Sequence, residues 1–136
     1  MLRRISITEL MSALLGHIAD GTGVRAIINP EGEKSPFFFL EPPTMEPVNT
    51  KTQFIDRFTF TVHCISEPSD PFSYAPVFAL ENALEEAMTD ELKLPRPFQV
   101  VSQTFAGVNA IKEDPSQEGH AVVTYVIDVS YGYRCK

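Results

Sequence analysis

The 136-residue chain is 43% hydrophobic and 21% charged, which is enough apolar material for one folded core and excludes a disordered protein. Eighteen acidic against eleven basic side chains give a net charge of −7, which disfavours nucleic acid and anionic lipid as partners. Arg3 and Arg4 are too few to form a phosphate-binding arm and are assigned no role. No apolar run approaches the roughly 20 residues of a membrane span, and no secretory signal precedes the first element, so we expect a cytoplasmic protein.

The first predicted element is an amphipathic helix. Ser6 and Glu9 have the spacing of a capping box, and apolar side chains then recur at three- and four-residue steps up to Ile18. Asp20-Gly21 is the predicted end of this helix. A β-branched run over residues 24–29 predicts a first strand, which Pro30 and Gly32 close.

A Pro-rich excursion follows, at about residues 30–52. Its prolines remove backbone donors and disfavour helix at the residues before them. Inside it, Phe37, Phe38, Phe39 and Leu40 are too apolar to remain wholly in water. They form either a short strand packed on the core or a patch covered by another subunit.

Residues 54–65 predict a half-buried antiparallel strand, because Phe58, Phe60, Val62 and Cys64 alternate with polar side chains. Asp56 interrupts the apolar side near its beginning. An unpaired buried carboxylate is costly, so we interpret Asp56 as the exposed end of the strand.

A second helix is predicted with Ser73 as its cap and an apolar stripe from Val77 to Met88, and Pro76 falls in its first turn. Glu81, Glu85 and Glu86 are expected on its solvated outer side.

The last third of the chain predicts strands. Residues 98–106 form one, and residues 107–119 form either a hairpin with an acidic loop at 112–118 or an irregular connection. The closing strand, residues 121–133, alternates most regularly. At about 14 residues it exceeds the usual strand of about five or six, so it either bends at Gly132 or projects beyond its sheet, where Tyr131 and Tyr133 would offer a contact surface.

The predicted fold class is therefore α+β: one domain over residues 1–136, with a mostly antiparallel sheet of four to five strands and two helices packed on it.

We predict no catalytic, metal or cofactor site. His63 and Cys64 are adjacent on a strand and point to opposite faces, which separates the only tempting nucleophile and base. His17, His63 and His120 look isolated, and no zinc-ligand spacing or phosphate-binding loop occurs. Cys64 and Cys135 are expected as free thiols in a reducing compartment.

The order of elements resembles the tail terminator and tail completion proteins of long-tailed, non-contractile phages and prophages. The resemblance lies in the helix at residues 7–18, the strand at residues 58–64 continuing into Ile65-Ser66-Glu67, the helix at residues 77–88, and the closing strand after Gly119-His120. It implies an α+β subunit of a homo-oligomeric, typically hexameric ring that caps the tail tube and faces the head connector. It also implies residence in the cytoplasm during assembly and then in the virion tail, without an enzymatic activity. The Pro-rich excursion and the acidic loop would be interface or tube-facing segments.

Three hypotheses follow. The first is the virion-assembly protein, with Phe37, Phe38, Phe39, Leu40, Tyr131 and Tyr133 as candidate subunit-interface residues. The second is a small-molecule-binding α+β module with an aromatic pocket between sheet and helices. The third is an enzyme that uses Glu81, Glu85 or His120, which no motif favours.

Overall fold

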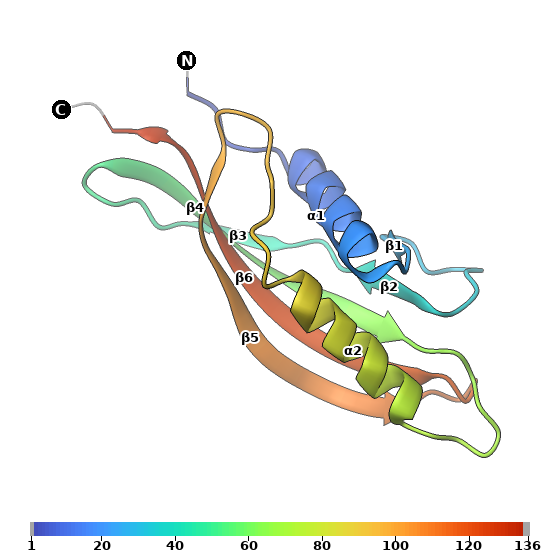
Figure 1. The fold of residues 1–136 in the computed structure, drawn as a ribbon. Helices are drawn as coiled ribbons and strands as arrows, with labels where there is room; N and C mark the ends of the chain where they lie inside the picture. Colours follow the sequence, from blue (N-terminus) through green and yellow to red (C-terminus); the bar gives the residue numbers. More distant parts are fainter. Residues whose placement is uncertain (1, 135–136) are drawn as a thin grey trace.

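A computed structural model describes residues 2–134. The elements, in chain order, are α1 (Ile7–Thr22), β1 (Ala26–Ile27), β2 (Phe37–Leu40), β3 (Thr44–Pro47), β4 (Gln53–Ile65), α2 (Ala75–Ala87), β5 (Gln99–Glu113) and β6 (Gly119–Tyr133). Both helices lie on one face of a long, curved sheet (Figure 1). Neither helix is long and apolar enough to cross a membrane, within the part of the chain that is described.

The sheet has the strand order β1-β2-β4-β6-β5, and β3 pairs with β4 beside β2. All pairs are antiparallel except β1 with β2. The predicted α+β class, the mostly antiparallel sheet and the two helices are confirmed. The sheet has six strands rather than four to five, because the Pro-rich excursion contributes β3. Pro47 fits there because β3 has no partner on its outer side among the described strands.

One core joins the helices to the sheet, which fits the expected single domain. Alternate residues of β4 and β6 point toward the helices and meet the apolar stripes of α1 and α2. The largest fully buried side chains include Leu10, Leu14, Phe38, Phe58, Phe60, Leu84 and Tyr125. Phe37, Phe38 and Leu40 are buried within the chain, as the core interpretation of that segment predicted.

Helix α1 begins with the predicted capping box: Glu9 N donates to Ser6 Oγ, and Ser6 N donates to Glu9 Oε1, each at 3.0 Å. Its predicted end was wrong, since the helix continues to Thr22 and stops at Gly23 with φ 72°. Gly21 has a packing role instead, because a Cβ there would lie 2.7 Å from Ala87 Cβ of α2. The first strand is also shorter than predicted, since only Ala26 and Ile27 pair with β2.

The interpretation of Asp56 as an exposed strand end was wrong. Asp56 is 1% exposed, and the Nε of Arg4 lies 3.2 Å from its Oδ1 and 3.0 Å from its Oδ2. The pair fixes the N-terminal segment to β4, which also gives Arg4 a role that sequence did not assign. Arg3 forms a surface pair with Glu9.

Strand β5 extends past the predicted end at Ala106 as far as Glu113. Its pairing with β6 shifts register three times, at residues 100–102, 105–107 and 108–110. Each shift reverses which face the following side chains point to, so the sequence shows no continuous alternation beyond Ala106. Of the two alternatives for this connection, the structure has the hairpin with an acidic loop, which a hydrogen bond from Asp114 N to Glu118 O closes.

Strand β6 pairs with β4 from His120, opposite Ile65, to its last residue Tyr133, opposite Gln53. Its end therefore does not project beyond the sheet. The pairing shifts register once, between Phe54 and Ile55, which lie opposite Gly132 and Ser130. Close packing fixes its start, since a Cβ on Gly119 would lie 2.7 Å from Val77 Cβ of α2.

Candidate functional site

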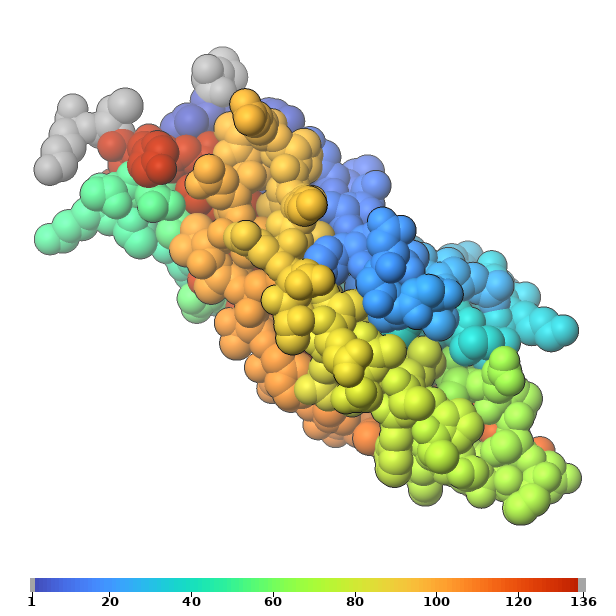
Figure 2. Space-filling view, viewed as in Figure 1, coloured from blue at the N-terminus to red at the C-terminus, as the bar shows by residue number. Residues whose placement is uncertain are grey.

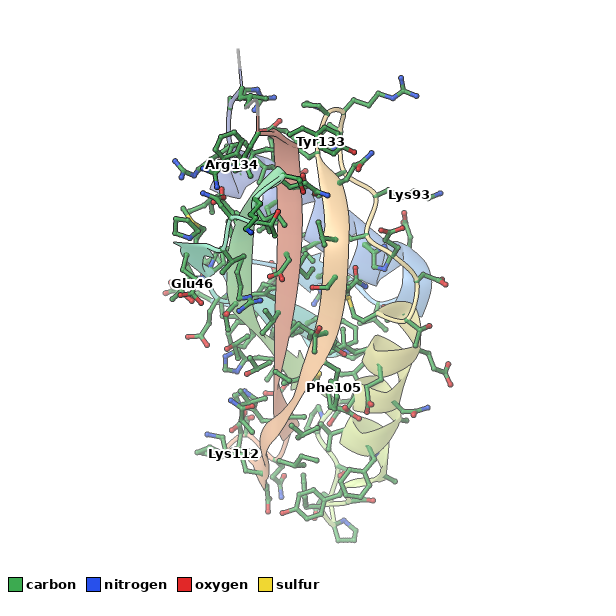
Figure 3. The ribbon with its side chains drawn as sticks, turned by 90° about the vertical axis from the view of Figure 1, so that its left-hand side faces the viewer. Glu46, Lys93, Phe105, Lys112, Tyr133 and Arg134 are labelled. Carbon is green, nitrogen blue, oxygen red and sulfur yellow. The ribbon has the colours of Figure 1, made fainter. Side chains whose placement is uncertain are left out.

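The inner face of β5 carries apolar side chains that the fold leaves exposed. Phe105, Val108 and Ile111 pair with Tyr125, Val123 and Ala121, which places them on the sheet face that bears the helices. The helices pack over β4 and β6, however, and leave these three side chains exposed. Figure 3 shows Phe105 on the side of β5 that faces α2.

The neighbouring side of α2 continues this apolar surface. Tyr74, Phe78, Glu81 and Glu85 recur at three- and four-residue steps and therefore share one side of the helix. Phe78 is 52% exposed, and its ring stacks on Tyr74 at 5.7 Å between centroids. In Figure 2 the surface of α2, in yellow, runs directly beside that of β5, in orange.

We call the surface between these two elements the α2–β5 groove. Its open cavity of about 550 Å³ is lined by Glu85, Glu86, Met88, Thr89, Glu91, Gln103, Phe105 and Tyr125. Phe78 and Glu81 of α2 and Val108 of β5 belong to the adjoining surface of the same two elements. The Phe105 ring meets the Tyr125 ring edge-on, at 5.6 Å between centroids.

Two buried polar groups in and beside the groove lack partners within residues 2–134: the hydroxyl of Tyr125, which lines the cavity, and Oε1 of the adjoining Glu81. Glu81 is 8% exposed, so its predicted place on the solvated outer side was wrong. Burial, followed by the neighbouring Glu85 carboxylate, raises the pKa of Glu81 from 4.5 to about 7. Burial likewise raises the pKa of Tyr125. The groove thus combines the aromatic side chains of Phe105 and Tyr125 with the carboxylates of Glu85, Glu86 and Glu91.

A second surface, at the other end of the sheet, has the opposite charge. We call it the Tyr133 end and define it by Lys51, Tyr133 and Arg134; Figure 3 shows Tyr133 and Arg134 at the end opposite Lys112. Tyr133 is 69% exposed. Neither Lys51 nor Arg134 forms an ion pair with any residue of the described range.

The backbone holds the Tyr133 end in place. Arg134 N donates to Thr52 O at 2.8 Å, and Arg134 Nη1 donates to Thr50 O at 2.9 Å. The guanidinium also lies over the Phe54 ring, 5.6 Å from its centroid. These contacts tie the end of β6 to the β3–β4 turn, so this basic surface is ordered before any partner binds.

The candidate interface residues are dispersed. Phe37, Phe38 and Leu40 are buried, and Tyr131 is 8% exposed with its ring stacked on Phe54. The accessible members of the predicted set are therefore Phe39, which is partly buried on the opposite face of the sheet, and Tyr133. The sequence did not predict the groove. Its only signal was the spacing of the apolar residues Phe105, Val108 and Ile111 in the part of β5 where polar and apolar residues do not alternate.

The expectation that the histidines are isolated was wrong for two of them. His63 Nδ1 lies 2.7 Å from His120 Nε2, while Glu41 Oε2 is 3.0 Å from His63 Nε2 and Asp114 Oδ2 is 3.0 Å from His120 Nδ1. Phe39 stacks on the His63 ring at 4.1 Å. Burial, opposed by Asp114, lowers the pKa of His120. This cluster joins β4, β6 and two loops on the sheet face away from the helices.

Cys64 takes no part in that cluster, because it points to the other face and is fully buried, as predicted. Its burial raises the pKa of the thiol. Cys135 lies outside the described residues. Across residues 2–134, no three His, Cys, Asp or Glu side chains are placed to hold a metal ion.

The fold defines a small α+β protein whose exposed apolar and basic surfaces are the features described above. The solved structures include a chain with a similar fold. In the virion of a native gene transfer agent particle, one chain matches with a TM-score of 0.66 over 91% of this chain and 93% of that chain, at 16% identity. The comparison with curated proteins gives no match.

A protein-family model described as a putative tail termination protein matches residues 1–136. The chain therefore belongs to this family of phage tail terminators, and the family resemblance predicted from the sequence is confirmed.

Proposed function

We propose that this protein is a structural subunit that closes the head-proximal end of a phage or prophage tail as a homo-oligomeric ring. It contacts tail-tube and connector proteins and performs no catalytic step. It assembles in the cytoplasm and remains in the virion tail. The observation that carries the proposal is the match to the tail termination family along the whole chain.

The surface supports an assembly role. Phe78, Phe105 and Val108 are exposed on the surface of the α2–β5 groove. Covering such apolar side chains with a partner lowers the free energy of the system. The chain also carries its basic and acidic surfaces in different places, which suits contacts with more than one neighbour. The likeness to a chain of the gene transfer agent virion supports the same fold class.

The net charge of −7 is compatible with a ring through which DNA passes. Negative walls repel the phosphate backbone and keep DNA from binding within a channel. Neither a membrane nor a specific nucleic-acid sequence is required as a partner in this proposal.

The test is the mass of the full chain in solution, measured by light scattering across a concentration series, with and without purified tail tubes. The expected result is a defined ring-sized species, with hexamers as the expected number, visible by negative-stain electron microscopy at one end of each tube. A protein that remains monomeric at high concentration and does not bind tube ends would overturn the proposal.

The small-molecule-binding module remains the second hypothesis, because the groove has an aromatic base and an open cavity of about 550 Å³. It predicts thermal stabilisation by a ligand in a broad screen. A ring-sized oligomer whose melting temperature no compound raises would exclude it.

A further inference from the structure

The α2–β5 groove has requirements that an isolated chain does not meet. Its sides need an apolar cover for Phe78 and Phe105, which are 52% and 44% exposed. Its cavity is lined by the carboxylates of Glu85, Glu86 and Glu91, and the adjoining Glu81 has its Oε1 buried without a partner in the described chain. A buried acceptor of this kind costs free energy until a donor reaches it. The fitting occupant therefore combines an aromatic or aliphatic side chain with a cation.

The Tyr133 end has that chemistry. Tyr133 supplies an exposed aromatic ring, and Lys51 and Arg134 supply two cations without ion pairs inside residues 2–134. Arg134 is already held by Thr50 and Thr52, so little conformational entropy is lost when it binds.

The two surfaces do not overlap. The groove is formed by α2 and the inner face of β5, whereas the Tyr133 end belongs to the β3–β4 turn and the last residues of β6. In Figure 3, Phe105 lies well along the sheet from Tyr133 and Arg134. One chain can therefore use both surfaces at the same time, each with a different neighbour.

We propose that the Tyr133 end of one copy docks in the α2–β5 groove of the next copy, with Tyr133 against the apolar sides and Arg134 facing Glu85. This inference rests on the proposed ring, and it names the surfaces that build it. The contact is heterologous, because the two copies contribute different patches. Heterologous contacts generate closed rings when the rotation between copies closes.

The occupant is a second copy rather than an unrelated protein because the charges match within one sequence. Each chain carries −7, so copies repel one another unless opposite charges meet locally. The cavity of the groove brings together three carboxylates, those of Glu85, Glu86 and Glu91. The contact therefore weakens as salt rises, while its apolar part remains.

The experiment is sedimentation velocity on the full chain at several concentrations, comparing wild type with Glu85→Lys, Arg134→Glu and the double variant. Each single reversal places like charges together and is expected to weaken association by about tenfold or more. The double variant restores opposite charges and is expected to recover association to within about threefold of wild type. Glu31→Lys, at an exposed position of the β1–β2 loop, makes the same change of charge and is expected to have no effect.

Unchanged association in both single variants, or a double variant weaker than either, would overturn the docking contact. If wild type still forms a ring in that case, the proposed function stands and only the assignment of surfaces fails. If wild type forms no oligomer with or without tail tubes, the ring and the docking contact both fail. Circular dichroism checks that each variant is folded. If Arg134→Glu loses structure, Lys51→Glu takes its place in the comparison.

Discussion

Strands β4 and β5 flank the same central strand, β6, and have similar lengths, yet the protein uses them differently. β4 has partners on both edges and points Phe58, Phe60 and Val62 into the core beneath the helices. Among the described strands β5 pairs on one edge only, and Phe105, Val108 and Ile111 on the same face remain exposed. The difference shows that hydrophobic alternation identifies the faces of a strand but not which faces a helix will cover.

The largest expected effect is the difference in unfolding free energy between matched substitutions in β4 and β5. Phe60→Ala removes a fully buried ring that stacks on Tyr125, and we expect it to lower the free energy of unfolding by about 3–5 kcal/mol. Phe105→Ala, on the same face of β5, should cost less than about 1 kcal/mol. Urea denaturation of both variants measures this difference. Equal losses would mean that β5 is covered like β4.

The next effect concerns the N-terminal segment fixed to β4. Arg4→Ala leaves the carboxylate of Asp56 buried without its cation, so we expect a clear loss of thermal stability. Arg3→Ala is the matched control, because its partner Glu9 lies at the surface and solvent screens that pair. Melting temperatures at neutral pH test the comparison. A larger loss in Arg3→Ala would contradict the burial of Asp56.

Glu81 predicts a pH dependence on the groove side of α2. Its pKa is raised from 4.5 to about 7, so between these values the folded chain holds a proton that the unfolded chain has lost. Stability therefore falls as pH rises through this window. In addition to burial, the Glu85 carboxylate contributes to the raised pKa of Glu81, and the Glu81 charge in turn contributes to the raised pKa values of Tyr125 and Cys64.

Glu81→Gln removes this dependence. We expect it to be more stable than wild type at pH 8, on the order of 1 kcal/mol after screening by solvent, and equal to wild type near pH 4. Urea titrations at both pH values measure the difference. A constant difference between the two proteins at all pH values would show that Glu81 titrates normally.

The smallest effect on stability comes from the exposed inner face of β5. Val108→Thr keeps a β-branched side chain at a position that is 42% exposed, so the free energy of unfolding should change by less than about 0.5 kcal/mol. Self-association should nevertheless weaken, because the groove loses an apolar contact. Sedimentation velocity and urea denaturation on the same sample test both parts. Lost stability with unchanged association would reverse the roles assigned to this face.

Sequence reasoning predicted the features that depend on near neighbours. The Ser6–Glu9 capping box, the alternation of β4 and the opposite faces of His63 and Cys64 all follow from spacing within a few residues. The regular alternation of β6 also follows from local pattern.

The features that sequence reasoning missed depend on residues far apart in the chain. Arg4 meets Asp56 across 52 positions, and His63 meets His120 across 57, because strand pairing brings them together. Glu81 looked solvated because it lies at the margin of the apolar stripe of α2, where the neighbouring sheet decides burial. No local pattern carries that information.

The three register shifts in β5 also bear on solubility at high concentration. They divide the strand into segments that keep register with β6 for at most four residues. Stacked amyloid-like sheets need continuous segments of about six or seven residues. Bulges of this kind are one device by which an exposed edge strand is kept from pairing with the edge strand of another chain.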